Sequence, residues 1–376
     1  AMALQWLERI YGPYAYPQMT VIHRIEGGGT EFPMMQGNGS PSLGLNLHEG
    51  GHIWSYGILA NNEWRSGWMD EGLTSYQSAW AQGLTPMERA HAGTEDRFAP
   101  IAGYRGKAIR MRLPRFESLN LGQTFADLEG EAEPMGTTAH EFRDFGTYNN
   151  MVYSRAEVMY GQLRDVLGDT SFLGFLHDYY HRWALKHVDE RAMRGSAERV
   201  SGRELGWFFG QWIHQTGVMD YALGDTRMPR DGSGWVTEAE VLRRGEYRHP
   251  MSVGVRTAAG WTVARVTQPP FDREVLRIRT EQEPLEVRVD PLHLSWDWDR
   301  RNDIRGSLNP FRVVRARVNF DWPFLEQADR ERDVVLFAPI GWYSEAGGIA
   351  AGLRERGSYL GLVDRMEGGV TYYVDP

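Results

Sequence analysis

The pattern of hydrophobic and polar positions changes near Gly224. Before this glycine, apolar residues recur at helical spacing, most clearly in 43–59 and in 153–166. After it, short segments alternate with period two between glycines and prolines, as strands do. The sequence therefore predicts a mainly helical first part followed by β structure, an α+β fold.

Periodicity and helix-ending residues predict the elements of the first part. Helices are expected at 4–10, 43–59, 153–166, 171–185 and 201–216, with a short strand at 19–23. Asp70 is placed to cap a further helix running to Trp80. Ser201 and Glu204 fit a capping box at the start of the last helix. Residues 85–145 read as mixed and rich in loops.

The second part reads as two β regions. Strands are expected at 251–255, 261–266, 275–278, 285–289 and 314–320, with more from 334 to the end. We predict an antiparallel sandwich for 224–304. Residues 305–376 form a β-rich segment that reads as the start of a larger β domain. Residues 1–223 form the first domain.

Composition narrows the class of protein. Of 376 residues, 41% are hydrophobic and 24% charged, an ordinary globular balance. The net charge of -9 argues against a nucleic-acid partner. The absence of cysteine excludes disulfides and thiolate metal ligands. No apolar run is long enough for a transmembrane helix. The opening Ala1-Met2-Ala3 reads as the start of a segment cut from a longer protein.

The candidate chemistry lies in a His-Glu-Gly-Gly-His pattern. His48 and His52 are four residues apart, so a helix places both imidazoles on one face, with Glu49 beside them. Glu71, with eighteen residues between it and His52, can supply a third ligand. Two imidazoles and a carboxylate leave a fourth position open for water, which is typical of catalytic zinc. The sequence predicts one Zn²⁺ ion held by His48, His52 and Glu71, with Glu49 as general base.

A solvated helix with ordinary histidines is the alternative to this metal site. Histidine is scarce, with 11 in the chain, so this spacing rarely arises by accident. Gly50 and Gly51 each cost a helix interior about 1 kcal/mol relative to alanine. This helix therefore needs packing or the metal to hold it, and the small glycines leave room for a neighbouring backbone.

With this motif and the stretch Gly28-Gly29-Thr30-Glu31 in view, the chain resembles the aminopeptidase N-like gluzincins, a family of zinc exopeptidases. The resemblance covers roughly residues 10 to 300. It implies a thermolysin-like first domain, with a small sheet and a mainly helical half. It also implies that Gly28 and Gly29 pair with the substrate backbone and that Glu31 binds the free α-amino group. A plain glycine turn with a surface glutamate is the alternative.

The resemblance also assigns a catalytic tyrosine. In the family it has a second tyrosine five residues before it, and Tyr148 and Tyr153 show that spacing. Tyr153 would hydrogen-bond the oxyanion of the tetrahedral intermediate, and Tyr148 would line the substrate site. The family's Glu-Lys-Gly after this tyrosine is here Ser154-Arg155-Ala156, so a packed core tyrosine stays an alternative.

These residues predict a zinc metallopeptidase, an aminopeptidase acting on peptide or protein substrates. Full family members carry a large β domain before the catalytic one, for which this chain has no room. A gluzincin endopeptidase and a non-catalytic peptide-binding or envelope scaffold therefore stay as alternatives. The β-rich tail favours a bacterial cell envelope or periplasmic setting, whereas the lack of cysteine fits the cytoplasm equally well.

Overall fold

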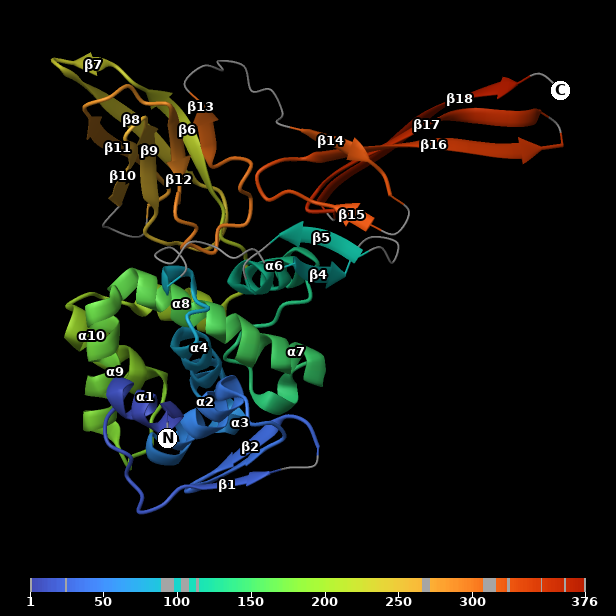
Figure 1. Ribbon diagram of the computed structural model, residues 1–376. Coiled ribbons are helices and arrows are strands. Elements are labelled where there is room, and N and C mark those ends of the chain that lie inside the picture. The colour runs from blue at the N-terminus through green and yellow to red at the C-terminus, as the bar shows by residue number, and fades with distance from the viewer. Residues whose placement is uncertain are drawn as a thin grey trace.

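A computed structural model describes most of the chain in three parts (Figure 1). The described residues are 2–23, 26–88, 98–102, 108–112, 115–265, 271–306, 316–322, 325–345, 347–361 and 363–374. Val266 and Val314, which end and begin two of the predicted strands, lie outside them. A helical part with a small sheet lies at one end, a β sandwich lies beside it, and an arm of long strands projects away from both.

The small sheet lies against the helix that carries the histidines. Its strands are β1 (Thr20–His23), β2 (Gly29–Phe32) and β3 (Met35–Asn38), in the order β1-β3-β2. β1 runs parallel to β3, and β2 runs antiparallel to it. Because β2 is an edge strand packed on the histidine helix, its backbone borders the candidate site.

Helices make up the rest of the first part. They are α1 (Met2–Ile10), α2 (Leu43–His52), α3 (Glu63–Ser66), α4 (Glu71–Ala81), α6 (Arg115–Leu128), α7 (Phe145–Asn149), α8 (Ala156–Leu167), α9 (Asp169–Trp183), α10 (Glu190–Ser201) and α11 (Gly206–His214). Residues 53–58 and 150–155 form π-helical turns. Gly168, with φ 78°, separates α8 from α9 as predicted. The mainly helical half with a small sheet is confirmed.

Two expectations for this part were wrong. No helix starts at Ser201: α10 ends there, Gly202 follows in the left-handed region at φ 67°, and the Ser201 hydroxyl donates to the Ala197 carbonyl. Asp70 stands before α4 but makes no capping bond, because its carboxylate is used elsewhere. Within the stretch read as mixed and rich in loops, the structure describes α6, a helix of 14 residues.

The sandwich has two antiparallel sheets. One is ordered β10-β9-β12-β13 and the other β11-β8-β6, with β7 paired to β8. The strands are β6 (Tyr221–Arg227), β7 (Arg230–Asp231), β8 (Gly234–Arg243), β9 (Ser252–Thr257), β10 (Gly260–Arg265), β11 (Arg273–Thr280), β12 (Glu286–Val289) and β13 (Ile304–Gly306). The antiparallel sandwich predicted from the alternating segments is thus observed.

One continuous core joins the helical part to the sandwich. It contains Trp54 and Trp68 from the helical part together with Val255 and Trp296 from the sandwich, all nearly inaccessible to solvent. Trp296 belongs to the loop after β12, which enters the helical part. There the Trp296 indole N–H donates to the Asn120 carbonyl at 3.0 Å. The sandwich is therefore packed as part of the same hydrophobic interior.

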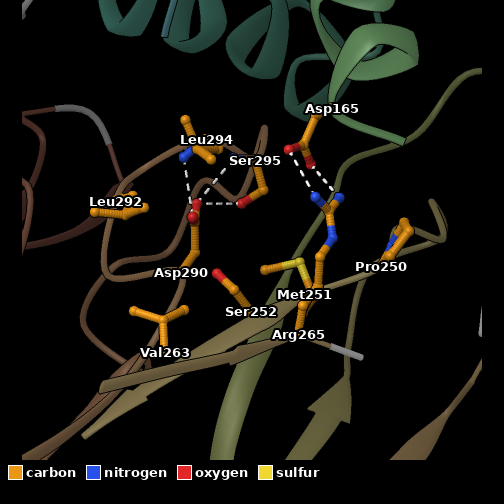
Figure 2. A pocket seen from close by; sticks show the side chains of 10 residues that line it. All are labelled: Asp165, Pro250, Met251, Ser252, Val263, Arg265, Asp290, Leu292, Leu294 and Ser295. Atoms are coloured by element: carbon orange, nitrogen blue, oxygen red, sulfur yellow. Dashed lines mark hydrogen bonds and ion pairs between the residues drawn. The ribbon is translucent and has the colours of Figure 1, made fainter. Parts of the chain in front are cut away.

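A cavity of about 150 Å³ lies at this junction (Figure 2). Asp165 from α8 faces it and forms an ion pair with Arg265 of β10 at 2.7 Å. The buried His249 ring lies 2.7 Å from the same carboxylate. On the other side of the cavity, Asp290 accepts hydrogen bonds from the backbone N–H groups of the loop after β12. Charged groups thus fasten the sandwich to α8.

The last part is an extended sheet with the order β14-β16-β17-β18. It consists of β14 (Arg317–Phe320), β16 (Val334–Ser344), β17 (Gly348–Tyr359) and β18 (Val363–Val374). β4 (Phe98–Ala102), β5 (Ala108–Arg112) and β15 (Leu325–Gln327) form a separate small sheet. Among the described residues, no helix is long and apolar enough to cross a bilayer.

Candidate metal centre and active site

The two histidines project from the end of α2. The Ser42 hydroxyl caps this helix by accepting from the Leu45 N–H at 3.2 Å. The His48 and His52 rings lie 4.8 Å apart, edge to face. The helix then widens into the π-helical turn 53–58, a feature frequent at functional sites. The spacing predicted from the sequence therefore places both imidazoles side by side.

Both imidazoles point to one oxygen of Glu71, the first residue of α4. The Glu71 Oε2 lies 3.2 Å from His48 Nε2 and 3.4 Å from His52 Nε2. Burial would raise the pKa of Glu71, but the two histidines that face its carboxylate lower it to about 2. The carboxylate therefore keeps its charge at neutral pH.

A metal ion fits this arrangement. Ligand atoms from His48, His52 and Glu71 all lie within 4.8 Å of one another. The Glu71 Oε2 is buried and has no hydrogen bond of good geometry among the described residues. Two nitrogens and one oxygen converging on an unsatisfied site are the donor set that zinc takes in catalytic centres. These three side chains can therefore hold Zn²⁺, as the sequence predicts.

Close packing of helices explains the glycines beside the ligands. A Cβ on Gly51 would overlap the Gln77 amide of α4, and one on Gly72 would lie 2.2 Å from the Ala156 Cβ of α8. A Cβ on Gly50 would come 3.2 Å from the Gln36 side chain. The room left by Gly50 and Gly51 is therefore filled by side chains, not by the neighbouring backbone expected from the sequence.

Asp70 orients the second histidine, a role that the sequence interpretation missed. Its Oδ1 lies 2.7 Å from His52 Nδ1 and accepts from the Ser55 hydroxyl at 2.5 Å. Burial opposes the charged imidazole, but this carboxylate raises the pKa of His52 well above its usual value. A hydrogen bond at Nδ1 leaves Nε2 free to face a metal. The signal in the sequence that could have indicated this role is that Asp70 directly precedes the ligand Glu71.

Glu49 lies on the next face of α2, against the small sheet. Its side chain is buried, and a Cβ on Gly29 would come 2.0 Å from its Oε1, so only glycine fits there. Burial raises the pKa of Glu49, while the two nearby histidines lower it. A carboxylate held partly out of water beside the ligands suits a general base.

β2 brings the glycine loop and Glu31 to the same place. Gly28 has φ 79°, which favours glycine, and its carbonyl accepts from the Gly39 N–H at 2.8 Å. Glu31 lies two residues after Gly29 on β2, with an oxygen within 4.8 Å of ligand atoms of Glu49 and His52. The sequence therefore located a carboxylate that does border the site.

Glu63 is a second carboxylate that the sequence interpretation missed. Oxygens of Glu63, Glu31 and Asp70 lie within 4.8 Å of one another. Burial, with Asp70 and Glu31 close by, raises the pKa of Glu63 to about 7. Glu63 lies in a short helix between the two ligand segments, with no motif to mark it. The crowded negative charge favours a cationic group beside the metal site.

The two tyrosines lie opposite the histidines. The Tyr153 hydroxyl donates to Glu71 Oε1, and its ring stacks on His48 with centroids 6.2 Å apart. Tyr148 packs edge to face against Tyr153 at 6.5 Å. Burial and the charge of Glu71 raise the pKa of Tyr153, so its phenol keeps its proton. The π-helical turn 150–155 aims Tyr153 at the ligands.

Residues 43–212 match the model of the peptidase family M1 domain. This stretch of the chain is similar to an M1 peptidase domain. The match runs from α2 to α11 and includes the metal ligands, Glu49 and Tyr153, whereas Glu31 lies outside it. The resemblance inferred from the motifs is confirmed at the level of this family.

Three relatives illustrate the similarity. Leukotriene A-4 hydrolase of Xenopus laevis is 25% identical over 199 residues, which are 49% of this chain and 29% of the hydrolase. Aminopeptidase A of Legionella pneumophila has a similar fold, with a TM-score of 0.53 and 14% identity over 78% of this chain and 33% of that one. An M1 zinc metallopeptidase from Deinococcus radiodurans has a TM-score of 0.42 and 19% identity over 57% of this chain and 43% of that one.

The likeness to the Legionella structure confirms the α+β fold. The chain spans about a third or less of the length of the hydrolase and of the Legionella aminopeptidase.

Proposed function

We propose that the chain is a zinc-dependent peptidase that removes residues from the N-terminus of peptides. The observation that carries this proposal is the convergence of His48, His52 and Glu71, with Glu49 beside them. Bound zinc would supply a Lewis acid that polarises the scissile carbonyl and acidifies a water. The Asp70 carboxylate would hold the His52 ring in the tautomer that offers Nε2 to the ion.

Glu49 is the proposed proton carrier. Its raised pKa brings it closer to the pH at which a carboxylate can both take and release a proton. It would take the proton of the attacking water and deliver it to the nitrogen of the leaving amine. The substitution Glu49→Gln keeps the size of the side chain and removes this exchange.

Tyr153 is the proposed donor to the oxyanion. Its hydroxyl keeps its proton and lies at the edge of the ligand set. A hydrogen bond that strengthens as negative charge develops on the carbonyl oxygen lowers the barrier more than it strengthens substrate binding. Tyr148, packed against Tyr153, would hold that ring in place and line the substrate site.

Glu31 and Glu63 are the proposed site for the substrate's amino group. Their carboxylates lie close together next to the metal ligands, where a charged N-terminus would fit. An amine held there fixes the first peptide bond at the metal and so restricts cleavage to the chain end. Gly28, just before β2, and Gly29, its first residue, would let the substrate backbone approach this edge.

Hydrolysis of aminoacyl-coumarin substrates by zinc-loaded protein tests the proposal. Release that stops with chelator and is lost in Glu49→Gln, with zinc content unchanged, is the expected result. Cleavage of an N-acetylated peptide at the rate of its free-amine form would instead identify an endopeptidase. Peptide binding without turnover in zinc-loaded wild-type protein would favour a non-catalytic peptide-binding scaffold.

A further inference from the structure

Two of the three long strands of the arm, β17 and β18, are divided along their length into a charged half and an uncharged half, while β16 carries no charge and is followed by Glu345 in the turn. Residues 338–344, 348–353 and 369–374 contain no Asp, Glu, Lys or Arg. The charges begin at one level: Arg354 pairs in register with Gly369, and Arg356 pairs with Glu367. At this level Arg354 forms an ion pair with Asp321 at 2.6 Å and lies 3.7 Å from Glu367. The uncharged halves are distal to the body of the molecule (Figure 1).

One face of this uncharged zone is an exposed apolar surface. The register places Tyr343 opposite Ile349, and Leu353 opposite Val370. Tyr372 lies on the same face, opposite Ala351. The exposed fractions of Val370, Tyr372 and Tyr343 are 79%, 76% and 72%. Contiguous apolar surface of this kind marks a contact with a partner or a membrane.

The opposite face of the zone is uncharged as well. Trp342 and Tyr373 lie there, both in register with Ala350, and are 43% and 48% exposed. A sheet that packs on one protein layer ordinarily keeps its other face polar. Exposed apolar and aromatic groups on both faces therefore favour an occupant that surrounds the strands over one that covers a single side.

Dimensions and composition together select lipid as that occupant. Seven residues of β16 in the zone extend about 20 Å at roughly 3.3 Å per residue. That length fits one leaflet and its headgroup region, in a bilayer whose hydrocarbon core is about 30 Å thick. Trp342, Tyr343, Tyr372 and Tyr373 are the amphipathic aromatic side chains enriched at membrane interfaces.

The strand edges limit how deep the zone can go. Within the described residues, 338–344 of β16 and 369–374 of β18 have β17 as their only strand partner. Backbone N–H and C=O groups left open in hydrocarbon are costly, whereas water and lipid headgroups can satisfy them. We propose that the uncharged ends of β16, β17 and β18 bind a lipid bilayer at its interface and so hold the peptidase domain at a membrane surface.

Co-sedimentation of the whole chain with phosphatidylcholine vesicles tests this proposal, independently of any peptidase activity. We expect the wild type to sediment with the vesicles and to stay bound in 0.5 M salt, because the contact is apolar. The double variant Leu353→Asp, Tyr372→Asp should lower the bound fraction at least tenfold. Val275→Asp, at a 54% exposed apolar position on β11 of the sandwich, is the matched control and should bind as the wild type does.

Three results would overturn the proposal. The first is wild-type protein left in the supernatant, and the second is release by salt, which would indicate electrostatic adsorption. The third is a vesicle-free dimer, measured by light scattering, that the double variant converts to monomer, because a second copy would then be the occupant. Melting curves of the double variant that match those of the control exclude misfolding as the cause of lost binding.

Discussion

In the metal site, residues that are not ligands fix the orientation of a ligand side chain. These residues can be tested separately from the ligands. His52 is fixed by Asp70, which is itself fixed by the Ser55 hydroxyl. Because all three groups are buried, few other orientations of the imidazole are available. The orientation of the His52 ring is therefore fixed before a metal ion binds.

Asp70→Asn is expected to weaken zinc binding 10- to 100-fold, the usual cost of losing a partner that orients a ligand. The amide can still bond to His52 but no longer stabilises its Nδ1–H with a charge. Competition with a chromogenic chelator measures the affinity. Asp231→Asn, at an exposed carboxylate of the sandwich, is the control. An unchanged dissociation constant would show that the ligands alone position the ion.

Glu63→Gln is expected to raise KM several-fold for substrates with a free amino group and to change kcat less. The reason is that the variant removes one of two carboxylates proposed to hold the cation, while Glu49 and Tyr153 are untouched. Steady-state kinetics on matched free and N-acetylated peptides separates the effects. Equal KM changes for both peptides would show that Glu63 does not bind the amine.

At the scale of elements, the sequence is informative where periodicity is long and breakers are clear. α8 and α9 were predicted because a glycine stands between two amphipathic runs. α10 was missed because it is strongly polar, and the apolar pattern starts again only at α11. The capping signal was then assigned to Ser201 instead of Asp189. Asp189 and Ser201 are both favourable N-cap residues. Local propensity cannot choose between them without knowledge of which helix face is buried.

The functional residues divide in the same way. His48, Glu49 and His52 follow one helix period, and Glu71 lies at a fixed spacing from them, so the sequence reveals all four. Asp70 and Glu63 act through space, across turns whose course depends on tertiary packing. A chain read one segment at a time offers no signal that these carboxylates meet. The structure is needed for the groups that surround the ion and the substrate.

Asp189→Ala is expected to lower the free energy of unfolding by about 1 kcal/mol, the usual cost of removing a helix N-cap. The Asp189 carboxylate accepts from the Ala192 N–H at 3.0 Å, a bond that alanine cannot replace. Urea unfolding followed by circular dichroism measures the change. Asp189→Asn should retain most of the stability, since its amide oxygen can still cap, and an equal loss in both variants would implicate the charge instead.

At the scale of the whole molecule, the loop after β12 joins the sandwich to the peptidase domain. Asp290, with φ 45°, accepts from the Leu294 and Ser295 N–H groups and pairs with Arg300 at 3.0 Å. Farther along this loop, the backbone N–H of Trp296 donates to the side-chain oxygen of Gln162 on α8 at 3.2 Å. The charge of one buried aspartate therefore supports the contact between two parts of the fold.

This arrangement predicts a specific loss of stability in acid. Burial opposes ionisation, but Arg300 and the other groups around the carboxylate lower the pKa of Asp290 to about 2. A carboxyl whose pKa is lower in the folded state than in the unfolded state, where it is about 3.9, stabilises the fold above pH 4. That contribution, about 2 to 3 kcal/mol, is lost as the pH falls from about 4 through 2.

Asp290→Asn should remove this acid dependence. Asparagine tolerates the left-handed backbone but removes one of the two carboxylates that pair with the buried Arg300, so the variant should be about 3 kcal/mol less stable at pH 7. Urea unfolding at pH 3 and pH 7 measures the free energy for both proteins. The difference between them should shrink toward pH 3, because the carboxyl of the unfolded wild type is then largely protonated while the folded one stays ionised. A constant difference at both pH values would mean that Asp290 acts through packing and not through its charge.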